Sequence, residues 1–462
     1  MRLIVATVTA SEQEVMDKLT ELVIIADDLT GANDTGAQFA KQGYRTMTLL
    51  DAKHTEDHHQ LDVCVINAET RSLEPEMAYR KIGEIRNLLQ LEKTPYVYKK
   101  IDSTMRGNIG SEIDALLEHE DFQLAVVAPA YPQNERIVVG GYLLVKQKLL
   151  EDSEISADPK SPVRLSHLPA LIGSQSKKKV GHINISALRG KGDALREQLA
   201  KQISEGKRIV VFDTVTQNDF EIMIDAVSAS ELRVLWVGSA GLAQSLSGRF
   251  ARETKNGLDR TVVVKEPSKS IMVIAGSVSG VTRQQIETLG EQEDCQIITA
   301  EPLGLLKNET YESEMNSLIK RMTEVLDQGN IPVLTTDTSD SSKNAIEEWL
   351  AEQKRDAFYA ASHIADCLGR IGKEVIANRK LGGLVLTGGD IAYRTCEHMR
   401  VKALRILDEV EEGIPFTQVV DGEFRDLLMI TKAGAFGNRL SLVRAVEKMK
   451  SYIKKAGLET VQ

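Results

Sequence analysis

Two adjacent carboxylates, Asp27 and Asp28, follow an apolar run at residues 22–26 in the first half of the sequence. Like charges at short range raise each other's pKa, so such a pair is costly to hold together. In α/β proteins, ligands bind outside the carboxyl ends of the strands. We therefore interpret this acidic turn as a binding site. The alternative interpretation is that both aspartates cap a helix beginning near Asn33, with Thr30 and Asn33 contributing to the cap.

Basic and hydroxylated side chains occupy the turns after two later apolar runs. Arg71 can hold a carboxylate with its planar guanidinium, and Lys100 can do so as a point charge. With the neighbouring carboxylates and hydroxyls, this set fits a small polyhydroxy acid. The alternative is a solvated surface with a helix cap, because Ser103 and Thr104 precede a predicted helix. For Lys99 and Lys100 taken alone, the surface interpretation is favoured.

Three glycine-containing turns in the second half share one pattern, since each ends a strand-like run and precedes a helix. They are Gly276–Gly280, Thr387–Asp390 and Lys432–Gly437. Glycine allows close approach of the backbone to a ligand, and helix N-termini offer unpaired N–H groups to phosphate. Lys432 can add a positive charge. Three such turns favour a nucleotide pocket over turns made by glycine for geometry alone. Neither a P-loop motif nor GxGxxG occurs, so a P-loop NTPase or an ordinary dinucleotide site is not indicated.

The composition excludes several classes of function. A net charge of −10 and a pI near 5.5 argue against a nucleic-acid partner, which would require a basic face. The four cysteines and eight histidines show no metal-ligand spacing, so no metal ligands are predicted. Isolated cysteines in apolar runs are typical of core packing in a reducing cytoplasm. With no signal-peptide pattern and no membrane-spanning apolar run, we expect a cytoplasmic protein without a membrane partner.

The elements that must position these residues follow a βα alternation. A chain of 462 residues predicts two or three domains, and apolar runs alternating with helices predict parallel sheets covered on both faces. Residues 137–145 alternate with two glycines, which indicates an antiparallel excursion. The polar stretch 253–270 is the best boundary. We predict an α/β protein of two domains, each a mostly parallel sheet flanked by helices, with a ligand cleft between them. The predicted division is an N-terminal extension at 1–21, a sugar-acid-binding domain at 22–255, a linker at 256–269 and a nucleotide-binding domain at 270–462.

Seven stretches together resemble the four-carbon acid sugar kinase family, once catalogued as a domain of unknown function. They occur in the family's order from residue 22 to the last helix. The stretches are IADDLTGANDTGAQFAKQG, YKKIDSTMRGNIGSEIDALL, VAPAYPQNERIVVGGYLLV, VGSAGLAQSL, IAGSVSGVTRQQI, LVLTGGD and ITKAGAFG. The resemblance implies ATP-dependent phosphorylation of the terminal hydroxyl of a tetronate, with Mg²⁺, an N-terminal sugar-acid domain and a C-terminal nucleotide domain.

The resemblance also assigns roles to residues. The expected sugar-acid residues are Asp27, Asp28, Arg71, Lys100, Ile101, Asp102, Ser103 and Thr104. The expected ATP residues are Ser277, Ser279, Gly388, Gly389, Asp390, Ile391, Lys432 and Gly434. Ile391 stands where the family pattern has a small hydroxylated residue, so only backbone contacts are expected there. The opening motif is most similar to that of the D-threonate kinases, and 3-oxo-tetronate or D-erythronate is the alternative substrate.

The expected reaction is in-line transfer of the ATP γ-phosphoryl group, with Asp27 or Asp102 orienting or deprotonating the acceptor hydroxyl. Asp28 is a third candidate for that role. Closure of the domains about the 253–270 stretch and a rigid two-lobed protein are both compatible with the sequence. Two other functional classes compete, a sugar-acid sensor that uses nucleotide as an effector and a dehydrogenase acting on the same acids. A homodimer is expected, as for many soluble enzymes.

Overall fold

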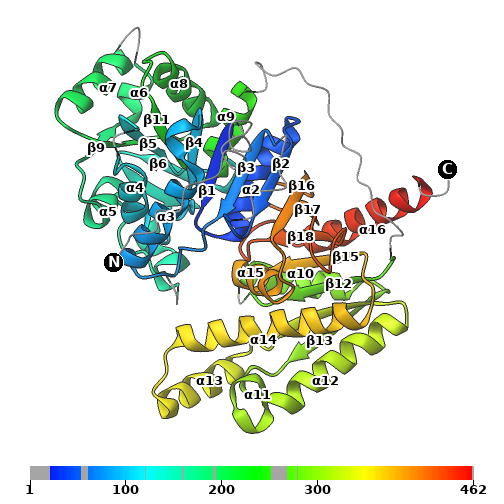
Figure 1. Cartoon of the computed structure of the whole chain (residues 1–462). Helices are drawn as coiled ribbons and strands as arrows, with labels where there is room; N and C mark the ends of the chain where they lie inside the picture. Colours follow the sequence, from blue (N-terminus) through cyan, green and yellow to red (C-terminus); the bar gives the residue numbers. More distant parts are fainter. Residues whose placement is uncertain are drawn as a thin grey trace, which may run out of the picture. The chain divides into compact units, whose positions relative to one another are not determined.

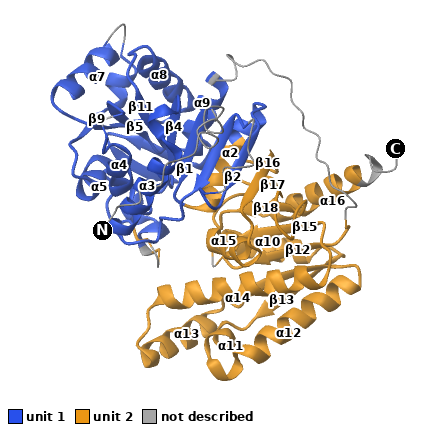
Figure 2. Cartoon of the chain, viewed as in Figure 1, with its two compact units in different colours: residues 1–27, 38–156, 163–256 blue, residues 28–37, 157–162, 257–462 orange. Residues whose placement is uncertain are grey.

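The computed structural model describes residues 21–53, 61–119, 121–158, 161–190, 194–250, 268–277 and 279–459. The predicted N-terminal extension, apart from Glu21, and most of the predicted linker lie outside these residues. The chain forms two compact units (Figure 2). Unit 1 comprises residues 1–27, 38–156 and 163–256, and unit 2 comprises residues 28–37, 157–162 and 257–462. We describe each unit by itself.

Unit 1 contains a parallel sheet in the strand order β2-β3-β1-β4-β11-β5-β10-β9, as the alternation of strands and helices predicts. Its strands are apolar along most of their length because helices cover both faces. After β1 the chain runs to one side of that strand, and it later returns to the other side as β4, so β1 marks a switch in direction. Ligands of open α/β sheets bind at such points. The strands are β1 (Leu22–Ala26), β2 (Thr46–Leu49), β3 (Val63–Asn67), β4 (Tyr96–Lys100), β5 (Leu124–Ala128), β9 (Val180–Ile183), β10 (Ile209–Phe212) and β11 (Val234–Gly238).

The helices around this sheet match most of the predicted periods (Figure 1). Two expectations were wrong. The first helix begins at Leu29 rather than near Asn33, and the single helix predicted over 187–205 is two helices, α6 and α7. The helices are α2 (Leu29–Lys41), α3 (Pro75–Leu89), α4 (Ile109–Leu116), α5 (Leu168–Gln175), α6 (Ile185–Leu188), α7 (Ala194–Ser204), α8 (Gln217–Ser228) and α9 (Ala240–Phe250).

The predicted antiparallel excursion is a separate three-stranded sheet in unit 1. Strands β6 (Arg136–Val139), β7 (Tyr142–Val145) and β8 (Lys148–Leu149) pair in order. Gly140 and Gly141 form the turn between the first two strands, and both have positive φ angles of 62° and 78°. Only glycine adopts such angles without strain, so the glycine pair fixes this hairpin.

Unit 2 contains a mixed sheet in the strand order β13-β14-β12-β15-β18-β17-β16. The first five strands are parallel, and β17 and β16 are antiparallel additions. The strands that precede the three glycine turns, β12, β15 and β18, are direct neighbours. Their carboxyl ends therefore lie side by side at one edge. The strands are β12 (Ile271–Ala275), β13 (Cys295–Ala300), β14 (Ile331–Thr336), β15 (Gly383–Thr387), β16 (Ala403–Glu409), β17 (Pro415–Val419) and β18 (Leu428–Lys432).

The helices of unit 2 cover its sheet, and α11 to α14 gather around β13 (Figure 1). The amphipathic α16 packs its apolar face on β15 and β18 through Leu442, Val446 and Met449. The first residues of α2 also belong to this unit. The helices are α10 (Gly280–Gly290), α11 (Pro302–Leu306), α12 (Asn308–Asp327), α13 (Asp340–Gln353), α14 (Ala357–Asn378), α15 (Gly389–His398) and α16 (Ser441–Glu459).

All four cysteines are buried free thiols, which confirms their interpretation as core residues. Burial raises the pKa of the Cys64 and Cys396 thiols to about 12. Among the helices that the structure describes, none is long and apolar enough to cross a membrane.

Candidate functional site

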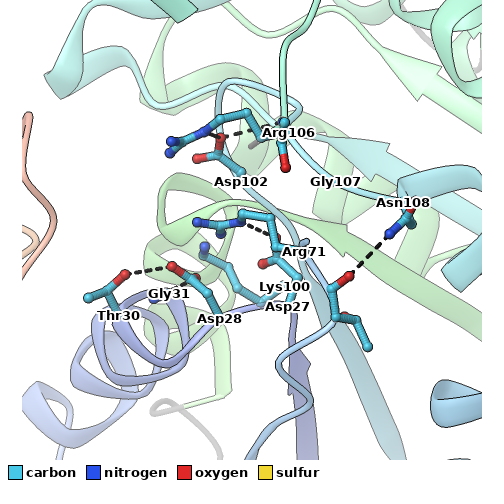
Figure 3. Close-up of polar contacts among 12 residues, drawn as sticks. Asp27, Asp28, Thr30, Gly31, Arg71, Lys100, Asp102, Arg106, Gly107 and Asn108 are labelled. Carbon is cyan, nitrogen blue, oxygen red and sulfur yellow. Dashed lines mark hydrogen bonds and ion pairs between the residues drawn. The ribbon is translucent and has the colours of Figure 1, made fainter. Parts of the chain in front are cut away.

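The predicted sugar-acid residues of unit 1 come from the turns after three adjacent strands, β3, β1 and β4. The β3 turn is tied to the end of β1, because the N–H groups of Thr70 and Arg71 both donate to the Asp27 carbonyl, at 3.0 and 3.2 Å. Figure 3 shows Arg71, Lys100 and Asp102 at this same edge of the sheet. The strand order thus brings together residues that are 75 positions apart in sequence.

Asp27 is buried at the end of β1 and pairs with Arg71. Nε of Arg71 lies 2.7 Å from Oδ2 of Asp27. The other oxygen, Oδ1, is buried and accepts no hydrogen bond from any residue that the structure describes. A buried carboxylate oxygen without a donor is costly unless a ligand supplies one. Asp27 therefore keeps one oxygen for a hydroxyl group.

Asp28 has a different task, which belongs to unit 2. Its Oδ1 accepts the N–H of Gly31 at 3.0 Å, and its Oδ2 accepts the hydroxyl of Thr30 at 2.7 Å (Figure 3). This is the geometry of a helix N-cap, so the capping interpretation holds for Asp28 and not for Asp27. Within the same unit, a Cβ placed on Gly389 would lie 3.3 Å from Oδ2 of Asp28. The cap thus approaches the second glycine turn closely.

The surface interpretation of Lys99 and Lys100 was wrong, because β4 is a central strand covered on both faces. Lys99 is fully buried, and its ammonium lies 2.6 Å from Oε2 of the buried Glu112 on α4. Lys100 is 5% exposed, and its ammonium has no hydrogen bond or ion pair among the described residues. A buried cation of this kind favours an anionic ligand.

Asp102 is the most strongly held carboxylate of the site. Nε of Arg106 lies 2.6 Å from its Oδ2, and the same oxygen accepts the hydroxyl of Thr104. Burial alone would raise the pKa of Asp102, but the nearby charges of Arg106, Arg71 and Arg136 hold that pKa well below its usual range. Asp102 is therefore a fixed anion that organises the arginines around it.

The helix-cap interpretation of Ser103 and Thr104 was also wrong. Helix α4 begins only at Ile109, and the residue at its N-cap position is Asn108. The Asn108 side chain instead donates to the carbonyls of Thr70 and Leu73, at 3.1 and 2.7 Å, which joins the β3 and β4 turns. The side chain of Ile101 is buried in the core, so only its backbone faces a ligand.

Three polar residues of this cluster were missed by the sequence reasoning. They are Arg106 beside Asp102, Glu112 beside Lys99, and Arg136, which donates through Nη1 to the Ser103 hydroxyl. The available signal was a charged residue in an apolar context. Glu112 lies in the mostly apolar α4, and Arg136 opens the apolar strand β6.

In unit 2, the three glycine turns converge as expected from the adjacency of β12, β15 and β18. The closest approach joins the first and third turns, since a Cβ on Gly434 would lie 2.1 Å from the Ser277 hydroxyl oxygen. Ser277 also accepts the N–H of Ser279 at 3.2 Å, and Ser279 caps α10. Gly388, with φ of 107°, precedes α15. The N-termini of two helices thus flank the turns and can receive an anion.

Lys432 lies inside the third turn rather than at its surface. Its ammonium donates to the carbonyls of Ala433, Gly434 and Phe436, at 2.8, 3.1 and 3.1 Å. Burial lowers the pKa of Lys432 to about 7, and the nearby Glu411 opposes this shift. In this structure Lys432 holds the shape of the loop. The third turn also differs from the expectation, because α16 begins only at Ser441.

Ile391 accounts for the departure from the family pattern. Its side chain is buried and packs against Gly276, where an added Cβ would lie 2.5 Å from Ile391 Cδ1. The side chain therefore joins the first two glycine turns by apolar contact. Asp390, the next residue back, is exposed at the start of α15.

Two family models match this chain, each on one half. A sugar-binding N-terminal domain matches residues 22–246, and a nucleotide-binding C-terminal domain matches residues 272–442. The chain is also similar to two crystal structures over 92% of its length. One, from Salmonella typhimurium LT2, has a TM-score of 0.74 and 25% identity over 98% of that chain. The other, from Haemophilus influenzae, has a TM-score of 0.68 and 23% identity over all of that chain and shows the shared fold.

Relatives with assigned names cover nearly the whole chain. A D-erythronate kinase of Heliobacterium modesticaldum is 32% identical over 91% of this chain and 95% of its own. A D-threonate kinase of Salmonella typhimurium is 31% identical over 92% and 97%. A 3-oxo-tetronate kinase of Salmonella typhimurium is 26% identical over 92% and 99%. With the polar cluster of unit 1 and the glycine turns of unit 2, these similarities show that the chain belongs to the four-carbon acid sugar kinase family and is a phosphotransferase.

Proposed function

We propose that this enzyme transfers the γ-phosphoryl group of ATP to the terminal hydroxyl of a four-carbon sugar acid, with D-threonate as the first candidate. D-Erythronate and 3-oxo-tetronate are the alternatives. The observation that carries the proposal is Asp27, whose Oδ2 is fixed by Arg71 while its buried Oδ1 has no donor within the described residues. The names of the relatives support a tetronate as the substrate class.

In this proposal Asp27 orients the acceptor hydroxyl and takes its proton as the bond to phosphorus forms. A general base needs a hydrogen-bonding oxygen within reach of the proton, which Oδ1 offers. Asp102 is less suited, because Arg106 and Thr104 occupy its Oδ2 and its depressed pKa makes it a weak base. Asp102 instead holds Arg106, while Lys100, Ile101, Ser103 and Thr104 line the substrate and Lys100 attracts its negative charge.

The nucleotide belongs to unit 2 in this proposal, so residues 22–255 would bind the sugar acid and residues 270–462 the ATP. The helix N-termini after the glycine turns would receive the phosphates. Lys432 would act mainly by holding the loop carbonyls that shape its turn. The residues proposed to contact ATP are Ser277, Ser279, Gly388, Gly389, Asp390, Ile391, Lys432 and Gly434.

Mg²⁺ fits this donor set as an ion that arrives with the nucleotide. No group of three carboxylate, histidine or cysteine side chains in the described part of the chain could hold a metal by itself. A magnesium ion bound to phosphates needs only one or two protein carboxylates. Asp28, beside Gly389, and Asp390 would supply them. When bound, the ion would neutralise the charge of the transferring phosphoryl group.

The test is ADP release by the purified full chain with ATP, Mg²⁺ and each of D-threonate, L-threonate, D-erythronate and 3-oxo-tetronate. We expect one acid to exceed the others clearly in kcat/KM, and phosphorus NMR to show a phosphate monoester on its terminal carbon. Nucleotide binding without ADP release on any of the four acids would overturn the proposal and favour a sensor.

A further inference from the structure

The antiparallel hairpin of unit 1 carries an arginine into the polar cluster. Arg136 is the first residue of β6 and is 8% exposed, although it opens a hairpin that lies outside the main sheet. Its Nη1 donates to the hydroxyl of Ser103, and its charge lowers the pKa of Asp102. Arg136 therefore lies against the β4 turn that the proposed substrate would contact.

The backbone on both sides of Arg136 is held firmly. Its N–H and carbonyl exchange hydrogen bonds with Tyr131, at 3.1 and 2.8 Å. Two residues on, Val138 exchanges two more with Thr214, at 2.9 and 3.0 Å. These bonds place the guanidinium independently of Ser103, so the hydroxyl contact is a result of the hairpin's position and not its cause.

A buried carboxylate locks the tip of the same hairpin. The N–H groups of Gly140 and Gly141 donate to Asp213 at 2.7 and 2.8 Å. Asp213 also accepts from Ile185 N and faces His182 Nε2, at 2.9 and 2.8 Å, and its side chain is fully buried. A hairpin fixed at its base and its tip presents a preorganised cation, which reduces the entropy cost of binding an anion.

The cluster brings more positive charge than its own carboxylates balance. Asp27, Asp102 and Glu112 each have a cation of their own in Arg71, Arg106 and Lys99. Lys100 and Arg136 bring two further positive charges to the same strand ends. Buried charge of one sign favours an anion of the other.

We propose that Arg136 binds the carboxylate of the sugar acid and is the residue that selects acids over neutral polyols. The inference rests on the proposed function. Arg71 is less suited to this task, because its Nε already bonds Asp27. A guanidinium carries five N–H donors, so Arg136 can bond a carboxylate and the Ser103 hydroxyl together.

The test compares Arg136→Gln with the wild type on the best tetronate and on the tetritol of the same stereochemistry, which lacks the carboxylate. We expect the KM for the acid to rise about 10- to 150-fold with kcat nearly unchanged. The preference for acid over tetritol should fall by a similar factor, and the KM for ATP should not change. Arg45→Gln, which removes an exposed arginine paired with Asp62, is the matched control.

Two outcomes would overturn the inference. One is an unchanged KM for the acid with a lower kcat, which would mean that Arg136 acts only through Ser103 and Asp102. The other is an equal loss on acid and tetritol. If tetritol turnover is too slow to measure, the KM for the acid decides. If Arg136→Gln does not fold, Arg136→Lys replaces it, and a rise in KM with unchanged kcat is again expected, because a lysine cannot bond a carboxylate with two parallel donors. Inactivity of the wild type on every tetronate would instead refute the proposed function.

Discussion

Lys99 and Glu112 form an ion pair of 2.6 Å behind the substrate turns, and both side chains are almost completely buried. The Lys99 ammonium also donates to the carbonyls of Ile25 and Lys100, at 3.4 and 2.9 Å. These carbonyls lie near the ends of β1 and β4, next to Asp27 and Asp102. The pair therefore links helix α4 to the two strand ends that carry the proposed site.

Removal of one partner of this pair should destabilise unit 1. We expect Glu112→Gln to lower the free energy of unfolding by about 3–5 kcal/mol, because it leaves a buried ammonium without its counterion. Lys99→Met should cost less, since burial already raises the pKa of Glu112 and the carboxyl can take up a proton. Denaturant unfolding followed by the fluorescence of Trp236, in a Trp349→Phe background, measures both changes.

The double variant is the critical comparison for this pair. Lys99→Met combined with Glu112→Gln should recover part of the stability, because an apolar group and a neutral amide leave no buried charge unpaired. A double variant that loses the sum of the two single effects would show that the two groups do not interact.

The two aspartates of the substrate turns should respond differently to amide substitution. We expect Asp27→Asn to lower kcat about 10²- to 10⁴-fold with little change in KM, because the amide cannot accept the proton. Asp102→Asn should mainly raise the KM for the acid and lower the melting temperature, because Arg106 loses its partner. Steady-state kinetics and calorimetry on both variants test this division. If both variants keep the wild-type kcat, the site is wrongly assigned.

The site could be predicted from the sequence only in part. Polar residues after apolar runs identified Asp27, Arg71 and the 100–104 stretch, because parallel strands place their carboxyl ends at one edge. The separation of Asp27 from Asp28 could not be predicted, since it depends on the helix beginning at Leu29 rather than near Asn33. One position more or less decides which carboxylate caps the helix.

Strand order is the second limit. The sequence predicts parallel strands, but neighbours in a sheet are set by crossover packing that local patterns do not encode. Lys99 illustrates the consequence, because a lysine pair is polar in sequence, while β4 lies between β1 and β11 and is buried. Arg136 illustrates it again, since its role depends on a hairpin reaching a turn more than 30 residues earlier in the chain.

The contact between Gly434 and Ser277 should be essential for nucleotide affinity. A methyl group on Gly434 would lie 2.1 Å from the Ser277 hydroxyl oxygen, so Gly434→Ala must displace one turn from the other. We expect the KM for ATP to rise at least about 10-fold, a loss of about 1.4 kcal/mol in binding, with the KM for the acid unchanged. Adding Ser277→Gly removes the clashing hydroxyl and should restore part of the affinity. Gly83→Ala, where a Cβ meets no atom within 4 Å, is the control, and an equal effect there would refute the prediction.

Lys432 should make the stability of unit 2 depend on pH in the alkaline range. Burial lowers its pKa from 10.5 to about 7 in the folded protein. Between these two values the unfolded chain binds a proton that the folded chain does not, so stability rises with pH. Below about pH 7 both states are protonated, and the contribution of Lys432 is constant.

The measurement is the difference in unfolding free energy between wild type and Lys432→Met at a series of pH values from 6 to 10, which cancels groups common to both. We expect this difference to be flat below pH 7 and then to rise in favour of the wild type by up to about 1.4 kcal/mol per pH unit. Lys343→Met, at an exposed lysine of α13, is the control. A flat difference over the whole range would mean that the three carbonyls around Lys432 keep its ammonium charged, because each of them stabilises the protonated form.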